Sequence, residues 1–148
     1  MSIQSYPAIF HEDIDGVSVC VPDLPYVLTC GRNFDEAYKM AVDAIAGYID
    51  LSRQDGEEIP EPSDPSAFAD RKNGGYIVMV TADFDDYIEK VFNAPVGRLV
   101  VLTQTEAQNA EHFGVDLSRL LKKALKEEFD RQREERRKQA LELANSQD

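Results

Sequence analysis

Short apolar runs separated by turn residues open the chain and predict three strands before the first helix. The runs lie at residues 6–12, 17–21 and 26–30. Asp15-Gly16 between the first two runs is a strong hairpin signal, so these strands are expected to pair antiparallel. Val17, Val19 and Val21 alternate with smaller residues, a period typical of a strand with one buried face.

A helical period replaces the alternation after Gly31, where the chain can turn. Asn33 is a favourable N-cap, and Glu36 follows at the spacing of a capping box, so a helix is predicted to begin at Phe34. Asp55-Gly56 is expected to end it. Five apolar residues share one stripe of this helix that can pack on a sheet: Ala37, Ala41, Ala44, Ile45 and Tyr48.

A proline-rich connector follows the helix and leads to a fourth strand. Residues 59–65 contain three prolines and are expected to be extended, and residues 67–75 are expected to continue as a loop. Residues 76–80 are almost continuously apolar, which predicts a strand that is central or covered on both faces. One or two helical turns are expected at residues 87–92. The first part of the chain is therefore predicted to be a βββαβ unit.

The pattern of the remaining residues predicts a strand and two helices. Residues 98–103 have the composition of a strand, a short polar helix follows, and Gly114 precedes a longer helix from Asp116. The charged segment 130–138 is interpreted either as a solvated helix end or as a tail that binds a partner. The longer helix carries an apolar stripe: Leu117, Leu120, Leu121, Ala124, Leu125 and Phe129.

Charge divides the chain at nearly the same place as the pattern. Residues 1–96 contain six basic and eighteen acidic side chains, whereas residues 97–148 contain ten of each, so the first part carries the whole net charge of −12. Two domains, 1–96 and 97–148, are predicted from this change. An acidic first domain repels nucleic acid and suits a basic protein partner, although a merely solvated surface also explains it.

The remaining sequence signals favour a cytoplasmic protein without a membrane segment. No apolar run approaches the length that a bilayer requires, and the N-terminus lacks the features of a secretion signal. Cys20 and Cys30 are therefore expected to be reduced, and to be buried as small apolar residues.

No catalytic, metal-binding or cofactor-binding motif is visible, so no enzyme activity, metal or cofactor is expected. His11 and His112 do not lie near a serine or cysteine in a nucleophile motif, and no phosphate-binding glycine loop occurs. Six aspartates are candidate ligands for Mg²⁺, but their positions are more typical of turn formers: Asp13, Asp15, Asp23, Asp83, Asp85 and Asp86.

Several short motifs of the first domain resemble those of the HicB family of bacterial antitoxins. In chain order they are Tyr6-Pro7-Ala8, Val21-Pro22-Asp23-Leu24-Pro25, Thr29-Cys30-Gly31, Glu36-Ala37, and Asp55-Gly56 followed by Ile59-Pro60-Glu61-Pro62-Ser63. The chain differs from the family pattern at Tyr26, where glycine is usual, and at Cys30, where glutamine is usual. The resemblance implies an α+β fold with a trimmed RNase H-like first domain that masks a small, basic HicA-like ribonuclease toxin.

The second domain resembles a ribbon-helix-helix module, particularly of the CcdA-like branch, in residues 98–129. The resemblance rests on the order of strand, helix and helix and on residues 114–121. It implies a homodimer whose paired strands enter the major groove of operator DNA, and leaves open whether two dimers form a tetramer.

Two sets of contact residues are predicted. The toxin-binding set is acidic: Glu12, Asp13, Asp15, Asp83, Asp85 and Asp86. The DNA-binding set combines one strand face with the start of the longer helix: Arg98, Val100, Leu102, Asp116, Leu117, Ser118 and Lys122. The opposite strand phase, with Val100 and Leu102 buried and Leu99, Val101 and Thr103 outward, is the open alternative. Either phase presents an unusually apolar surface to DNA.

The predicted function is that of an antitoxin that masks its toxin and represses its own operon as a dimer. A stand-alone ribbon-helix-helix regulator, whose first domain senses or binds another partner, is the alternative. A third hypothesis is an oligomeric binding domain with neither activity.

Overall fold

The computed structural model describes residues 2–147. By its internal contacts the chain divides into two compact units, Met1–Pro95 and Val96–Asp148. None of the helices within the described residues is both long enough and apolar enough to cross a membrane.

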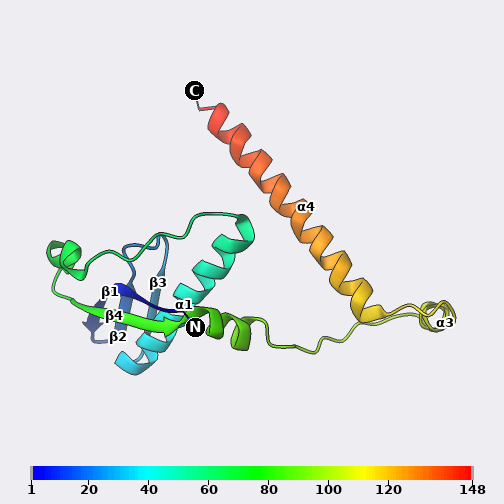
Figure 1. Ribbon diagram of the computed structural model, residues 1–148, viewed down its shortest axis with the longest axis horizontal. Helices are drawn as coiled ribbons and strands as arrows, with labels where there is room; N and C mark the ends of the chain where they lie inside the picture. Colours follow the sequence, from blue (N-terminus) through cyan, green and yellow to red (C-terminus); the bar gives the residue numbers. More distant parts are fainter. Residues whose placement is uncertain (1, 148) are drawn as a thin grey trace. The chain divides into compact units, whose positions relative to one another are not determined.

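A four-stranded antiparallel sheet forms the first unit (Figure 1). Its strands are β1 (Ile3–Asp13), β2 (Gly16–Cys20), β3 (Leu28–Gly31) and β4 (Tyr76–Asp83), in the order β3-β2-β1-β4. The predicted hairpin is confirmed, since β1 and β2 pair antiparallel and Asp13 lies opposite Gly16 beside the tight turn.

β4 lies at an edge of this sheet, which corrects the expectation of a central strand. Its apolar side chains lie alternately on the two faces of the sheet. Val80 is fully buried and Val78 packs against the same core, whereas Met79, one position away, is 38% exposed. The short 3-10 helix η1 (Pro65–Arg71) contacts β4. The continuous apolar run therefore reflects partial cover of both faces, and not a second neighbouring strand.

The helix α1 (Phe34–Asp55) lies across one face of the sheet and begins where the sequence predicts. The side chain of Asn33 accepts a hydrogen bond of 2.9 Å from the Glu36 amide, which confirms the N-cap. Arg32 Nε donates a hydrogen bond of 2.8 Å to the Glu36 carboxylate. Gly56 ends the helix in the left-handed region at φ 68°, where glycine carries no steric penalty.

The core of the first unit lies between α1 and the inner face of the sheet. It combines alternate residues of the strands with the predicted helix stripe, and its largest fully buried members include Tyr6, Phe10, Val19, Ile45 and Val80. The opposite side chains of the strands lie on the outer face. Cys30 is exposed there and Cys20 half-buried, which corrects the expectation that both cysteines are buried.

Hydrogen bonds join the proline-rich connector to the sheet. The Tyr6 hydroxyl donates to the Pro60 carbonyl oxygen at 2.9 Å. The Asp23 carboxylate accepts from the Ser63 amide at 2.9 Å and from the Ser63 hydroxyl at 2.6 Å. The connector is extended as predicted, but η1 replaces part of the loop expected at residues 67–75. Asp64 explains this helix, because its side chain accepts from the Ser66 amide beside Pro65 at the first position.

The first unit ends in two short helical segments. α2 (Phe84–Tyr87) is capped by Asp83 and continues directly into the π-helical turn η2 (Ile88–Phe92). Phe84 and Ile88 are buried against the core, so the predicted helical turns begin slightly earlier than the sequence suggests.

Two helices form the second unit. α3 (Gln104–His112) begins with a complete capping box between Thr103 and Glu106, and α4 (Leu117–Asn145) is one uninterrupted helix (Figure 1). Gly114 takes φ 61° between them. Residues 96–103 contain neither helix nor strand, so the strand predicted at 98–103 is not formed in the single chain. A ribbon strand requires a second strand beside it, and the unit offers none.

Candidate partner-binding site

The predicted toxin-binding residues fall into two groups in the first unit. Glu12, Asp13 and Asp15 lie at the tip of the β1–β2 hairpin. The Tyr76 hydroxyl donates to Glu12 at 3.0 Å, and Asp13 accepts from the Ile14 amide at 2.7 Å. Asp13 and Asp15 line a shallow depression beside Arg32 and Glu36.

The second acidic group, Asp83, Asp85 and Asp86, interacts with other residues of the first unit. Asp83 accepts from the Asp86 amide at 3.0 Å and thereby caps α2. Asp85 forms an ion pair of 2.6 Å with Arg53, and Asp86 forms one of 2.8 Å with Lys90. The hairpin group therefore keeps more of its charge available to a partner.

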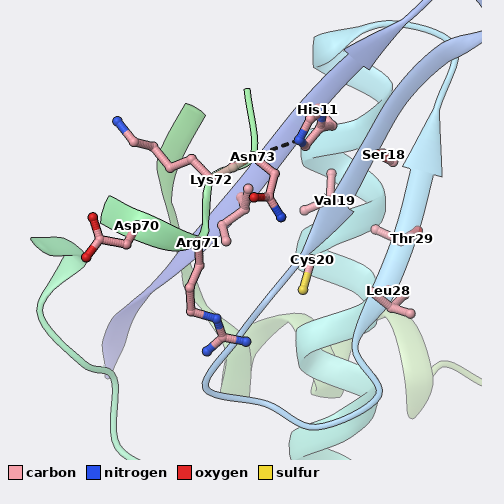
Figure 2. A pocket seen from close by; sticks show the side chains of 11 residues that line it. His11, Ser18, Val19, Cys20, Leu28, Thr29, Asp70, Arg71, Lys72 and Asn73 are labelled. Carbon is pink, nitrogen blue, oxygen red and sulfur yellow. Dashed lines mark hydrogen bonds between the residues drawn. The ribbon is translucent and has the colours of Figure 1, made fainter. Parts of the chain in front are cut away.

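A groove of about 600 Å³ crosses the outer face of the sheet, opposite α1 (Figure 2). Its walls are strand residues on one side and the segment that ends η1 on the other. The two sides meet where His11 Nε2 and the Lys72 carbonyl oxygen form a hydrogen bond of 2.9 Å. The sequence did not predict this groove. It is lined by Ile9, His11, Ser18, Val19, Cys20, Leu28, Thr29, Asp70, Arg71, Lys72 and Asn73.

The lining of this outer-face groove is partly apolar and carries more basic than acidic residues. Ile9, Val19 and Leu28 are apolar, and Arg71 and Lys72 outnumber the single acidic residue, Asp70. The Arg71 guanidinium also stacks over the Phe68 ring at 5.7 Å. The groove is therefore an exception within an acidic unit.

A second groove, of about 540 Å³, lies between α1 and the loop that joins β2 to β3. Its rim carries three exposed apolar side chains, since Tyr26 is 99%, Leu28 72% and Leu51 58% exposed. Asp55 and Glu57 also line it, and none of its lining residues is basic. The sequence marked Tyr26 only as a departure from the family pattern.

Burial and hydrogen bonds shift the pKa values of several titratable groups of the first unit. Burial raises the pKa of Tyr76, and its hydrogen bond to Glu12 adds to the effect. The hydrogen bond from Arg32 lowers the pKa of Glu36. The hydrogen bond to Asp86 raises the pKa of Lys90. These shifts move each group away from neutral pH. Within residues 2–147, no group of three or more His, Cys, Asp or Glu side chains could hold a metal ion.

Much of the predicted DNA-binding set lines one groove of the second unit. Arg98, Val100 and Leu102 lie there with Leu117 and Ser118 of α4. Residues that line this groove are less exposed than their neighbours: Val100 is 58% and Leu102 40% exposed, whereas Leu99 is 92% and Val101 85% exposed. Residues 98–103 form no strand here, so which of the two strand phases would face DNA stays a prediction.

The start of α4 is already capped. Asp116 accepts a hydrogen bond of 3.1 Å from the Arg119 amide, so a carboxylate occupies the helix end that was predicted to grip a phosphate. Lys122 is exposed one turn further along the helix. The DNA-binding role of these residues stays a prediction.

The apolar stripe of α4 is uncovered in the single chain. Leu117, Leu121 and Phe129 are 48%, 45% and 50% exposed. Leu120 and Leu125 add to the same surface. A contiguous apolar surface of this kind is typical of a protein interface.

A family model described as the HicB-like antitoxin of bacterial toxin–antitoxin systems matches residues 6–125. A curated relative, Antitoxin HicB 2 from Photorhabdus laumondii subsp. laumondii, is 43% identical over 58 residues, which are 39% of this chain and 42% of the relative. The chain thus spans less than half the length of that relative.

Two solved structures have a similar fold. A toxin–antitoxin complex from Streptococcus pneumoniae matches with a TM-score of 0.53 and 21% identity, over 86% of this chain and 99% of that chain. The Burkholderia pseudomallei antitoxin HicB matches with a TM-score of 0.51 and 21% identity, over 82% and 96% respectively. At these identities the likeness concerns the fold alone.

Proposed function

The chain belongs to the HicB-like antitoxin family of bacterial toxin–antitoxin systems, and we propose that it neutralises a small, basic HicA-like ribonuclease toxin. The observation that carries this proposal is the family match over residues 6–125, which includes the whole sheet from Tyr6 onward and the first part of α4. We place this neutralisation in the cytoplasm, where the toxin would meet its RNA.

Neutralisation by masking requires contact area and matched charge, and no chemical step. A stable complex buries about 800 Å² on each partner. The first unit supplies an apolar groove between α1 and the β2–β3 loop. Its excess of acidic side chains would accelerate the encounter with a basic toxin. A toxin held in this way has no access to RNA on the covered face.

The second unit would join two chains into a homodimer. The exposed stripe of α4 supports this role, because a second chain that packs on it would bury its apolar side chains. In the proposed ribbon-helix-helix arrangement, residues 98–103 of the two chains pair as strands and bind operator DNA, so that the antitoxin represses its own operon. The trimmed RNase H-like description of the first unit belongs to the same proposal.

Isolation of the tagged full chain from its native host tests the proposal. A small basic protein should co-purify in stoichiometric amount, and its ribonuclease activity should be silent in the complex and appear once the two are separated. A homo-oligomer without such a partner would contradict the antitoxin role. Salt-sensitive promoter binding by that oligomer would then favour the stand-alone regulator.

A further inference from the structure

Tyr26 combines two unfavourable properties that make it the most unusual residue of the first unit. Its backbone lies in the left-handed region at φ 69°, a conformation that residues other than glycine rarely adopt. Its side chain is 99% exposed, so the ring gains no packing within the unit in return. A strained and fully exposed aromatic residue suggests a role outside the fold of the single chain.

The surrounding loop fixes this geometry. Leu24 and Val27, on either side of Tyr26, are 1% and 6% exposed and anchor the loop in the core. Three backbone hydrogen bonds of 3.1–3.2 Å link Val21, Leu24 and Val27 to one another. The ring of Tyr26 is therefore presented outward by a rigid support, which keeps the entropy loss on binding small.

Tyr26 stands at the rim of the groove between α1 and β3. Leu28 and Leu51 lie on the same groove and are more than half exposed. Ala44 contributes only a methyl group from α1 and Gly47 has no side chain, and a Cβ added at Gly47 would meet no atom within 4 Å beyond its own stretch of helix. The surface thus offers one projecting aromatic ring next to an open apolar hollow.

Charge indicates the partner for this groove. Asp55 and Glu57 are its only charged lining residues, whereas the outer-face groove carries Arg71 and Lys72. A basic protein that presents an apolar side chain between lysine or arginine residues matches the Tyr26 groove and not the outer-face groove.

We propose that Tyr26, Leu28 and Leu51 form the anchor at which the antitoxin holds its basic toxin, with Tyr26 as the residue that contributes most to binding. This inference rests on the proposed function. Aromatic side chains in rigid surroundings dominate many interfaces, and their removal weakens binding by tenfold or more.

Four full-length variants test the anchor against the small basic protein that co-purifies with the wild-type chain. Tyr26→Gly removes both the ring and the strain, Tyr26→Asn removes the ring but tolerates the left-handed region, and Tyr26→Phe keeps the ring. Asn73→Gly is the matched control, because Asn73 also has a positive φ of 48° but lies on the outer-face groove.

The Gly and Asn variants of Tyr26 should bind the toxin at least tenfold more weakly, while Tyr26→Phe and Asn73→Gly stay within about threefold of wild type. Tyr26→Gly should also unfold at an equal or higher urea concentration, which separates lost binding from lost folding.

Toxin affinity that is unchanged in Tyr26→Gly would overturn the anchor and leave the antitoxin role intact. A loss of self-association with unchanged toxin affinity would assign the groove to a second copy and overturn it as well. A wild-type chain without a toxin partner would remove the proposed function and the anchor together.

Discussion

At the scale of single residues, the family motifs of the first unit are explained by the fold. Tyr6 of the first motif donates to Pro60 of the last, and Asp23 of the second accepts from Ser63. Gly31 lets β3 approach α1, since a Cβ at this position would lie 2.3 Å from the Ala37 amide nitrogen. These residues predict the architecture because they join segments that are distant in sequence.

Replacement of Asp23 by alanine should release the connector from the β2–β3 loop. Two hydrogen bonds to a partly buried carboxylate are lost, so the free energy of unfolding should fall by about 1.5–3 kcal/mol. Urea denaturation measures the change. Asp70→Ala, an exposed aspartate at the end of η1, should stay within about 0.5 kcal/mol of wild type. Equal stability of the two variants would contradict the assigned role of Asp23.

Tyr6 should make stability depend on alkaline pH. Burial is the main cause that raises the pKa of its hydroxyl, so folding favours the protonated form. Its contribution is present in full below the unfolded-state value of about 10 and is lost as the pH rises through the folded-state value. Tyr6→Phe should cost about 0.5–1.5 kcal/mol at neutral pH and make the decline above pH 10 shallower. Urea midpoints of both proteins across pH 7–11 test this, and parallel curves would contradict it.

At the scale of elements, prediction succeeded where local signals and tertiary packing agree. The cap at Asn33 and the stop at Gly56 are local, and the structure places both as expected. The position of β4 in the sheet depends on which strand pairs with β1, which its apolar composition does not specify. The strand expected at residues 98–103 is absent from the single chain, and we propose that it forms only where a second chain pairs with it. The two grooves beside β3 are made by residues distant in sequence, so no pattern along the chain reveals them.

The apolar stripe of α4 should hold the dimer together. Leu121→Glu places a charge in the middle of the stripe and should convert the dimer to a monomer at micromolar concentration. Leu141→Glu changes the same helix at a position that is 64% exposed and outside the stripe, and should leave the dimer intact. Sedimentation velocity of both variants tests the prediction, which fails when the two behave alike.

Arg98 should carry most of the base-specific contact that the ribbon can make. Arg98 is the only charged residue among residues 98–103, and the apolar side chains there cannot read base edges by hydrogen bonds. Arg98→Ala should weaken binding to the chain's own promoter by about 1–3 kcal/mol. Titration of labelled promoter DNA at fixed salt measures it, with Lys90→Ala in the first unit as the control. Equal affinities would assign repression to another surface or exclude it.

At the scale of the whole molecule, charge separates two kinds of partner. The first unit carries the net negative charge and suits a basic protein, whereas the balanced second unit repels DNA less and exposes an apolar stripe. This division was visible in the sequence. The surface that we propose as the toxin anchor was not visible there. The acidic residues near β4 that the sequence predicted for toxin binding include two that form ion pairs with Arg53 and Lys90, and their role stays a prediction. Exposure and backbone strain at Tyr26 became evident only in the folded chain.

We propose that this chain silences an RNA-cleaving toxin by covering it. The most direct test is a titration of the separated toxin, at fixed concentration with a messenger RNA substrate, by the full-length chain. RNA cleavage should fall in proportion to added antitoxin and cease at a stoichiometric ratio, because masking removes one toxin molecule for each site occupied. Cleavage that continues in the presence of excess chain would contradict the account.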